Sequence, residues 1–429
     1  MKLLQITSYK LQVIIHPALR APLLLKGGEL EPPFSFSSFF FLLSTLLLFC
    51  LLPQASFAQK SQILHDQSKV IRNKFTVQPK DLLEINTDHV KIVVEESKEN
   101  EVCFITTITL NKSTKADMEN LSNAIQISNN QSGNKIFYNF RVDWSGKAKT
   151  NNLHGSTEIT LTIYAPKYIF YDIKARWGSV QMQNVHNDFN ATVSYGSLTA
   201  EDLFGNKNYI KVNYGSLKME DLNGTQNHVV VNYGNYKIYK AGNLTLDVNY
   251  SNGELADGGS INLSSGYSNL KFGTVKSLAF SSAYDVISIQ NQIFDLKGEM
   301  KYGTLNIKSL GNSCSLTSFS YSKITFSERL KSFLTILISA SNSEMNLNIP
   351  VDQSFAFDFS GRYTNYKDNN LKITDGVYFK EKKLWKLDEM FYEYNSRTIK
   401  MAGTYGKNHN SGKSVKLETR YGTVSLFER

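Results

Sequence analysis

Residues 211–224 read "KVNYGSLKMEDLNG", and similar phrases stand on both sides of them. Nineteen residues earlier the chain reads "TVSYGSLTAEDLFG", and nineteen residues later it reads "VVNYGNYKIYKAGN". An aromatic residue, usually followed by small or turn-forming residues, recurs at intervals of 17–19 residues. These aromatic anchors are Trp177, Tyr195, Tyr214, Tyr233, Tyr250, Tyr267, Tyr284, Tyr302 and Tyr321. A fixed period of this length indicates a repeat architecture.

Apolar residues alternate with polar ones on both sides of each anchor. Val212 and Ile210 stand two and four positions before Tyr214, and Leu217 and Met219 stand three and five positions after it. Alternation with period two predicts strands with one buried face. The alternation slips by one residue across the Gly-Ser pair, which indicates a corner or a bulge.

A unit of about 18 residues cannot bury its own apolar face, but stacked copies can. The predicted fold is therefore all-β: a single-stranded parallel β-solenoid (β-helix) of about 18-residue coils with an N-terminal antiparallel β cap. Stacking places like residues above like residues, so the anchors are predicted to form a structural aromatic ladder, inward or at the corner. An exposed tyrosine stripe that binds glycans is the alternative.

The chain is predicted to have five regions. Residues 1–58 are interpreted as a signal peptide with an atypical N-terminal extension, because a long apolar stretch ends at Pro53 and small residues precede Gln59. An uncleaved membrane anchor is the rival interpretation. The remaining regions are a polar linker (59–80), a β-rich capping region (81–168), regular repeats (169–345), and irregular final coils with a C-terminal cap (346–429).

The distribution of charge bears on the kind of partner, and the cysteine content bears on whether a disulfide forms. The 429 residues carry a net charge of +9, but the Lys and Arg residues are scattered, so no nucleic-acid patch is predicted. After the apolar segment only Cys103 and Cys314 remain. They are interpreted as two buried thiols, with a disulfide as the alternative.

Several motifs together resemble a known group of proteins. A signal segment and a β-rich stretch ending in "LTIYAPK" are followed by "WGSVQMQNV", "YGSLTAEDL", "YGSLKMEDL" and a closing "YGTVSLFER". This order is similar to the exported "putative adhesin" β-solenoid domains of unknown function in Bacteroidetes-type bacteria. The resemblance implies an adhesin-like envelope protein, and it brings no functional residues with it. The regular tyrosine anchors and the long extension before the signal segment depart from that pattern.

Catalytic chemistry has one weak candidate, an acidic column at the seventh position after the anchor, formed by Asp202, Asp221 and Asp257. Lys240 and Thr274 interrupt it, so we interpret it as a duplicated turn residue that faces water. The histidines form no metal-like or triad-like cluster, and His186 and His228 are assigned to turns. No catalytic residue, cofactor or metal is predicted.

Outward positions give the candidate binding face. Asn213, Asn232 and Asn249 stand one position before successive anchors, and Lys218, Lys237 and Lys271 stand four positions after others. A flat repetitive face suits an extended polymer or another protein, and it also suits any solenoid that needs a polar exterior.

The sequence thus favours an exported envelope protein without catalysis, with an adhesin-like binding or scaffolding role toward a protein or glycan. A carbohydrate-active β-helix enzyme and an envelope regulatory or sensor protein are the alternatives.

Overall fold

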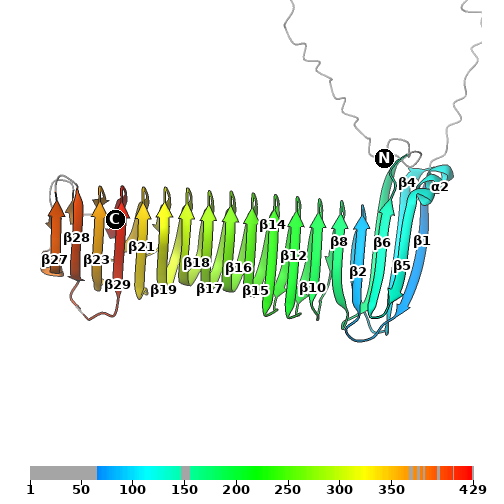
Figure 1. Ribbon diagram of the computed structural model, residues 1–429, viewed down its shortest axis with the longest axis horizontal. Helices are drawn as coiled ribbons and strands as arrows, with labels where there is room; N and C mark the ends of the chain where they lie inside the picture. Colours follow the sequence, from blue (N-terminus) through cyan, green and yellow to red (C-terminus); the bar gives the residue numbers. More distant parts are fainter. Residues whose placement is uncertain are drawn as a thin grey trace, which may run out of the picture. The chain divides into compact units, whose positions relative to one another are not determined.

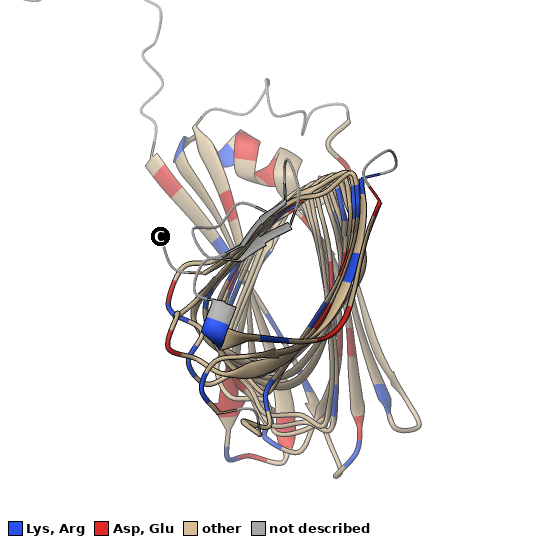
Figure 2. Ribbon diagram, turned by 90° about the vertical axis from the view of Figure 1, so that its left-hand side faces the viewer, with Lys and Arg blue, Asp and Glu red and all other residues tan. Residues whose placement is uncertain are grey.

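The computed structural model describes residues 65–145, 155–366, 371–373, 377–379, 382–393, 397–408 and 410–427, all within one unit, Gln62–Arg429. This unit is a parallel β-solenoid whose strands stack side by side along its long axis (Figure 1). Seen along that axis, the coils superpose as a flattened ring with two walls (Figure 2), and side chains fill the space between them. The predicted fold class is confirmed.

Each regular coil turns sharply at its anchor. We call the strands that end at an anchor wall A, and those that begin after one wall B. From Phe170 to Asn232 the two walls are formed by separate strands, which are, in chain order, β8 (Phe170–Arg176), β9 (Ser179–Met182), β10 (Phe189–Ser194), β11 (Ser197–Leu203), β12 (Lys207–Asn213), β13 (Ser216–Leu222) and β14 (Gln226–Asn232). In the following coils one long strand runs from wall B to wall A: β15 (Asn235–Asn249), β16 (Asn252–Gly266), β17 (Asn269–Ala283), β18 (Val286–Lys301) and β19 (Thr304–Ser320).

Equivalent residues of successive coils are paired in parallel register. In wall A, Val193 pairs with Val212, which pairs with Val231. In wall B, Leu198 pairs with Leu217. These valines and leucines are buried, so the core consists of columns of like side chains. The apolar alternation read from the sequence therefore marks the core-facing positions correctly.

The first coils at the N-terminal end are not in chain order. Strands β2 (Leu82–Asp88) and β3 (Lys91–Ser97) form one coil, which pairs in parallel with β8 and β9 on one side. On its other side it pairs in parallel with β6 (Lys135–Val142) and β7 (Ser156–Pro166). The predicted antiparallel cap is formed by β1 (His65–Thr76), β4 (Glu101–Ser113) and β5 (Ile125–Ser132).

Helix α2 (Lys115–Ala124) interrupts the strands of the cap. Thr114 and Asp117 form a capping box, in which each side chain accepts a hydrogen bond from the other residue's backbone N–H. Leu121 is buried against the core. The capping box therefore fixes the point at which β4 ends and the helix begins.

The C-terminal end also departs from chain order. Its elements are β20 (Lys323–Phe326), β21 (Thr335–Ser341), β22 (Glu344–Ile349), β23 (Phe355–Arg362), β24 (Asn365–Tyr366), β25 (Leu371–Ile373), β26 (Val377–Phe379), η3 (Lys382–Leu384), β27 (Trp385–Glu393), β28 (Thr398–Tyr405), β29 (Ser414–Arg420) and β30 (Thr423–Phe427). The last coil, β29 and β30, lies between the coil of β21 and β22 and the coil of β23 and β24. Strands β28 and β27 continue wall A in antiparallel pairing (Figure 1).

Two of the predicted regions need correction. Residues 65–76 of the predicted polar linker form β1, which pairs with β4 along its length, so this segment is not a linker. The predicted capping region 81–168 contains two parallel coils as well as antiparallel strands. The predicted signal segment, residues 1–58, lies outside the described residues. Among the helices that the structure describes, none has the length and apolar character needed to cross a membrane.

Candidate functional site

The anchors form a continuous stack of rings along the corner between the two walls. Neighbouring ring centroids lie 4.1–5.1 Å apart from Trp177 to Tyr321, with interplanar angles of 1–11°. The side chains are 44–55% exposed. The rings therefore stack at the corner and face solvent, and the inward placement considered from the sequence is wrong. Their faces cover one another, so mainly ring edges and hydroxyl groups are available to a ligand.

The backbone explains why the rings point outward although they share the parity of buried positions. Every anchor adopts a left-handed conformation, with φ between 51° and 61°. This conformation is unusual for an aromatic residue and turns its side chain away from the core. Each anchor N–H donates to a carbonyl of the next coil, as Tyr195 does to Asn213 at 2.9 Å. The corner therefore continues the hydrogen-bond ladder between coils.

The residue after each anchor lines the inside of the corner. It is glycine in the earlier coils, then Ser251, Ser268 and Asp285. The Ser251 hydroxyl accepts from Gly234 N–H at 3.1 Å, and the Ser268 hydroxyl accepts from Ser251 N–H at 3.2 Å. These hydroxyls join the coils at positions where glycine has no side chain.

Asp285 is a buried carboxylate, 1% exposed, that sequence reasoning missed. One of its oxygens accepts from Ser268 N–H at 2.7 Å. The other accepts from the hydroxyls of Ser265 and Ser282, each at 2.6 Å. Ser265 and Ser282 stand two positions before their anchors, where the preceding coils have valine. The sequence therefore contained a sign of this buried cluster. Three polar residues, Ser265, Ser282 and Asp285, replace small or apolar residues at positions that face one another in the repeat.

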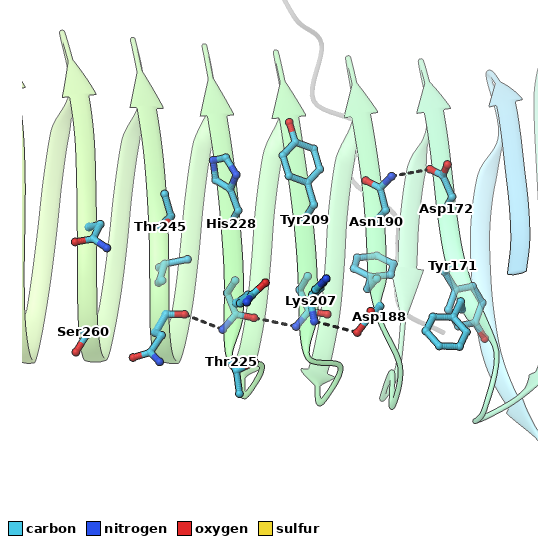
Figure 3. A pocket seen from close by; sticks show the side chains of 18 of the residues that line it. Tyr171, Asp172, Asp188, Asn190, Lys207, Tyr209, Thr225, His228, Thr245 and Ser260 are labelled. Carbon is cyan, nitrogen blue, oxygen red and sulfur yellow. Dashed lines mark hydrogen bonds between the residues drawn. The ribbon is translucent and has the colours of Figure 1, made fainter. Parts of the chain in front are cut away.

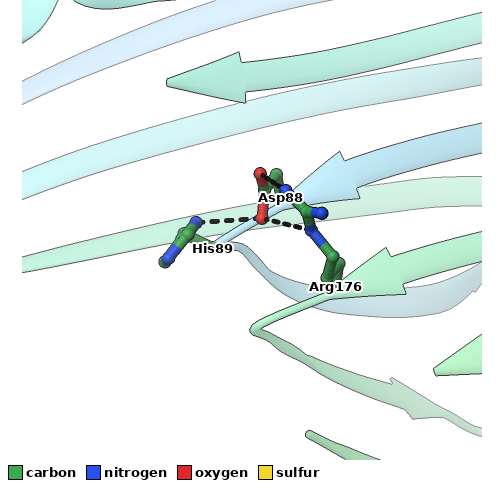
Figure 4. A network of polar contacts seen from close by, with 3 residues as sticks. All are labelled: Asp88, His89 and Arg176. Carbon is green, nitrogen blue, oxygen red and sulfur yellow. Dashed lines mark hydrogen bonds and ion pairs between the residues drawn. The ribbon is translucent and has the colours of Figure 1, made fainter. Parts of the chain in front are cut away.

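The ladder begins with a residue that the repeat did not reveal. His89 has φ 60° and stacks on Trp177 at 6.0 Å between ring centroids. Asp88 accepts hydrogen bonds from Arg176, and His89 Nδ1 lies 2.9 Å from its carboxylate (Figure 4). Ile85 and Ile92 stand at the same spacing around His89 as the apolar residues around the tyrosines, so the pattern was present without its aromatic residue.

The predicted binding face has the following arrangement. Asn232 Nδ2 donates to Asn213 Oδ1 at 3.0 Å, and Asn249 Nδ2 donates to Asn232 Oδ1 at 3.3 Å, so the three amides form a ladder beside the aromatic corner. The lysines lie on the outer side of wall B. Lys218 pairs with Glu220 at 3.2 Å and Lys237 with Glu254 at 3.8 Å, and both approach the Tyr239 ring. Lys271 is exposed on the same row. The asparagines and lysines thus lie on two different walls.

The acidic column is interrupted at Lys240, as the sequence indicates. Asp202 and Asp221 are paired in register, and the next position is Lys240, which lies 3.6 Å from Asp221. Asp202 and Asp221 lie in strands and are half-buried, so their assignment to a water-facing turn was wrong. His228 likewise lies in strand β14, 2.7 Å from Asp247.

A shallow depression of about 770 Å³ lies on the outer face of wall A near the start of its strands (Figure 3). Asp172, Asn190, Tyr209, His228 and Thr245 follow one another across it, one from each coil. Asn190 donates to Asp172 at 3.1 Å. Acids, bases and amides are mixed here, so the depression has no marked charge preference.

Within the described residues, no cluster of His, Cys, Asp and Glu side chains could hold a metal ion. Cys103 and Cys314 are both free thiols, Cys314 buried and Cys103 half-buried. Burial raises the pKa of the Cys314 thiol to about 12, so this thiol stays protonated in the folded protein.

Comparisons with known proteins give structural matches only. No model of a known family and no curated protein matches the chain. A "putative adhesin" from Bacteroides fragilis matches at 16% identity and a TM-score of 0.33, covering 56% of this chain and 96% of that one. A "putative lipid binding protein" from Parabacteroides distasonis matches at 13% identity and a TM-score of 0.26, covering 66% of this chain and 94% of that one. A "putative adhesin" from Parabacteroides merdae matches at 14% identity and a TM-score of 0.25, covering 65% of this chain and 92% of that one. At these identities and TM-scores the matches carry no argument about what this chain binds.

Proposed function

We propose that the protein is an exported, non-catalytic β-solenoid of the bacterial cell envelope that binds or scaffolds an extended partner. One observation carries this proposal: outward polar side chains form rows across several successive coils, three asparagines on wall A and charged residues, mostly lysines, on wall B. The Asn213, Asn232 and Asn249 amides join into a ladder beside the aromatic corner. A partner with its own repeating units can contact several coils at once, and each added contact strengthens binding without a deep pocket.

The first test is location. Cell fractionation followed by N-terminal sequencing is expected to recover the protein outside the cytoplasm, beginning at Gln59. Recovery in the cytoplasm with the apolar segment intact would contradict export.

The second test is binding of the purified protein to isolated envelope fractions. Replacing Asn213, Asn232 and Asn249 with alanine is expected to weaken binding severalfold. Lys211→Ala with Val230→Ala is the matched control, because these residues point outward from the same wall one row away. Equal binding by all three proteins would remove the asparagine row from the proposal, and absence of binding would contradict the function.

The same material tests the enzymatic alternative. Purified protein is expected to release no unsaturated or reducing ends from acidic polysaccharides. Release that disappears with Asp202→Ala or Asp221→Ala would replace the proposed role with carbohydrate cleavage.

A further inference from the structure

The C-terminal coils carry a second concave surface, which we call the trough. It has a volume of about 820 Å³ and crosses the outer face of wall A from β18 to β27. Hydroxyl side chains, including those of Ser320, Ser341 and Ser360, line its floor. The trough differs in charge and composition from the depression near the start of wall A.

Basic residues dominate one row of the trough. The register places Lys301, Ser320, Ser341, Arg420 and Arg362 side by side on successive strands, each one position before the corner residue with a left-handed backbone. At the usual spacing between strands this row is about 19 Å long. All three basic side chains are exposed. The row thus offers three cations with two hydroxyls between them.

These cations have no acidic partner. In the part of the chain that the structure describes, Lys301, Arg362 and Arg420 form no ion pair with a carboxylate, and the two arginines lie over the rings of Tyr363 and Tyr421. The two acids of the trough are engaged elsewhere: Glu299 accepts from Ser281 at 2.9 Å, and Glu418 pairs with Lys416 at 3.3 Å. Arginine with free donors is suited to bidentate contact with an anionic group.

Arg176 shows the same position with its charge paired. It stands in the same row at the other end of the solenoid, but Asp88 pairs with it at 2.9 Å. The Arg176 charge is therefore neutralised locally, whereas the charges of Arg362 and Arg420 remain available.

Two further features of the trough favour a ligand. The Phe391 side chain at its end is 52% exposed, which offers an aromatic surface to the apolar face of a sugar ring. Ser318 in its floor has φ 58°, at a bulge where β19 carries an additional residue relative to β18 and β21. Such bulges are frequent beside functional surfaces.

Resting on the proposed envelope function, we propose that the trough binds an acidic polysaccharide. Its carboxylate or sulfate groups contact Arg362, Arg420 and Lys301, its hydroxyl groups contact the serines, and a sugar ring packs on Phe391. An extended chain fits a long, shallow, hydroxyl-rich surface. An acidic protein partner would need a larger apolar contact area than a single exposed phenylalanine provides.

The test measures binding of the purified full chain to polygalacturonate, dextran sulfate and neutral dextran by calorimetry. We expect binding to one or both acidic polymers, weakening with salt, and none to neutral dextran. Binding to polygalacturonate alone would identify carboxylate as the recognised group, and binding to dextran sulfate alone would identify sulfate. The double variant Arg362→Gln/Arg420→Gln is expected to lose at least tenfold in affinity, and Phe391→Ala severalfold. Arg176→Gln is the matched control and should bind as the unchanged protein does.

Three results would overturn the proposal: undiminished binding by the double variant, an equal loss with Arg176→Gln, or equally tight binding of single-stranded DNA. If the double variant fails to fold, Lys301→Gln alone tests the same row. Failure of the unchanged protein to bind either acidic polymer, while it still binds envelope fractions, would overturn the trough and leave the proposed function intact. Failure to bind any envelope fraction would overturn both.

Discussion

Two neighbouring stretches of the solenoid solve the same stacking problem with different residues. Between Tyr195 and Tyr233 the coils have 19 residues, glycine follows each anchor, and the second corner is a short loop. Between Tyr250 and Tyr284 the coils have 17 residues, Ser251, Ser268 and Asp285 follow the anchors, and one strand runs through the second corner. The ring spacing hardly changes, from 4.8–5.0 Å in the first stretch to 4.7–4.8 Å in the second.

The difference shows that strand pairing and ring stacking, rather than coil length, set the spacing between coils. The two additional residues of the longer coils are absorbed at the second corner. There Asn227 donates to the carbonyls of Gly224 at 2.7 Å and Asn243 at 2.9 Å, and accepts from Asn208 at 2.8 Å. Buried amides close the loop in the long coils, while hydroxyls and a carboxylate fill the first corner in the short ones.

The largest effect is expected at Asp285. Replacement with alanine leaves the Ser265 and Ser282 hydroxyls and the Ser268 N–H without their acceptor. The free energy of unfolding should fall by about 3 kcal/mol, since hydrogen bonds to a buried charge are strong and their loss is only partly offset by removal of the charge. Denaturant unfolding monitored by circular dichroism measures this.

A triple variant tests whether the corner of the short coils needs a carboxylate, or only needs every buried donor to have an acceptor. Asp285→Ser combined with Ser265→Val and Ser282→Val restores the residues that preceding coils have at these positions. It should recover most of the stability. If it remains as unstable as Asp285→Ala, the short coils depend on the carboxylate for a reason other than satisfying its neighbours.

The glycine corners should reject a side chain that the serine corners accept. A Cβ at Gly215 would lie 1.9 Å from the Gly196 carbonyl oxygen, so Gly215→Ala forces the coils apart and should cost about 2–3 kcal/mol. Ser251→Ala forces nothing apart; it removes the acceptor for Gly234 N–H and the hydroxyl that donates to the Asn249 carbonyl, and it should cost about 1 kcal/mol. Equal losses in thermal unfolding would mean that the two corners do not differ as described.

The sequence predicts the regular coils well because each position depends on its neighbours in a repeating way. Val193, Val212 and Val231 carry the same side chain at the same distance from an anchor, so period and parity identify the core. The outward direction of the rings was harder to predict, because it depends on a left-handed backbone at a residue type that seldom adopts it.

Chain order at the two ends could not be predicted from the repeat. The phrase at Tyr421 matches any coil, and nothing local states that its coil lies between those of Asn342 and Tyr363. His89 belongs to the ladder although it stands 88 positions before Trp177 in the chain. Parallel pairing with either neighbour satisfies the same local pattern, so the repeat alone does not determine the order of the coils.

A smaller effect is expected from interrupting the ladder in its centre. Tyr250→Asn removes two ring contacts, each worth about 0.5–1.5 kcal/mol, but asparagine tolerates the left-handed backbone better than most residues. Asn342 occupies a corner of this kind with φ 51°. The expected loss is about 1 kcal/mol by denaturant unfolding. Tyr250→Ala lacks asparagine's tolerance and should lose more, and a variant with no measurable loss would show that the stack does not stabilise the fold.

The smallest effect on stability is expected at Tyr236, which lies between the 19-residue and the 17-residue coils. Its replacement separates the contribution of the buried ring from that of the hydroxyl group. Tyr236 is buried, its hydroxyl has no hydrogen-bond partner within the described structure, and Gly253 of the next coil makes room for its ring. Tyr236→Phe keeps the ring and removes the unpaired hydroxyl, so stability should rise by up to about 1 kcal/mol. Burial also raises the pKa of the Tyr236 phenol. Above the ordinary tyrosine pKa of about 10 the unfolded chain ionises first, so the unchanged protein loses stability as pH rises and the advantage of phenylalanine grows. A constant difference from pH 8 to pH 11 would mean that this hydroxyl is not sequestered from water.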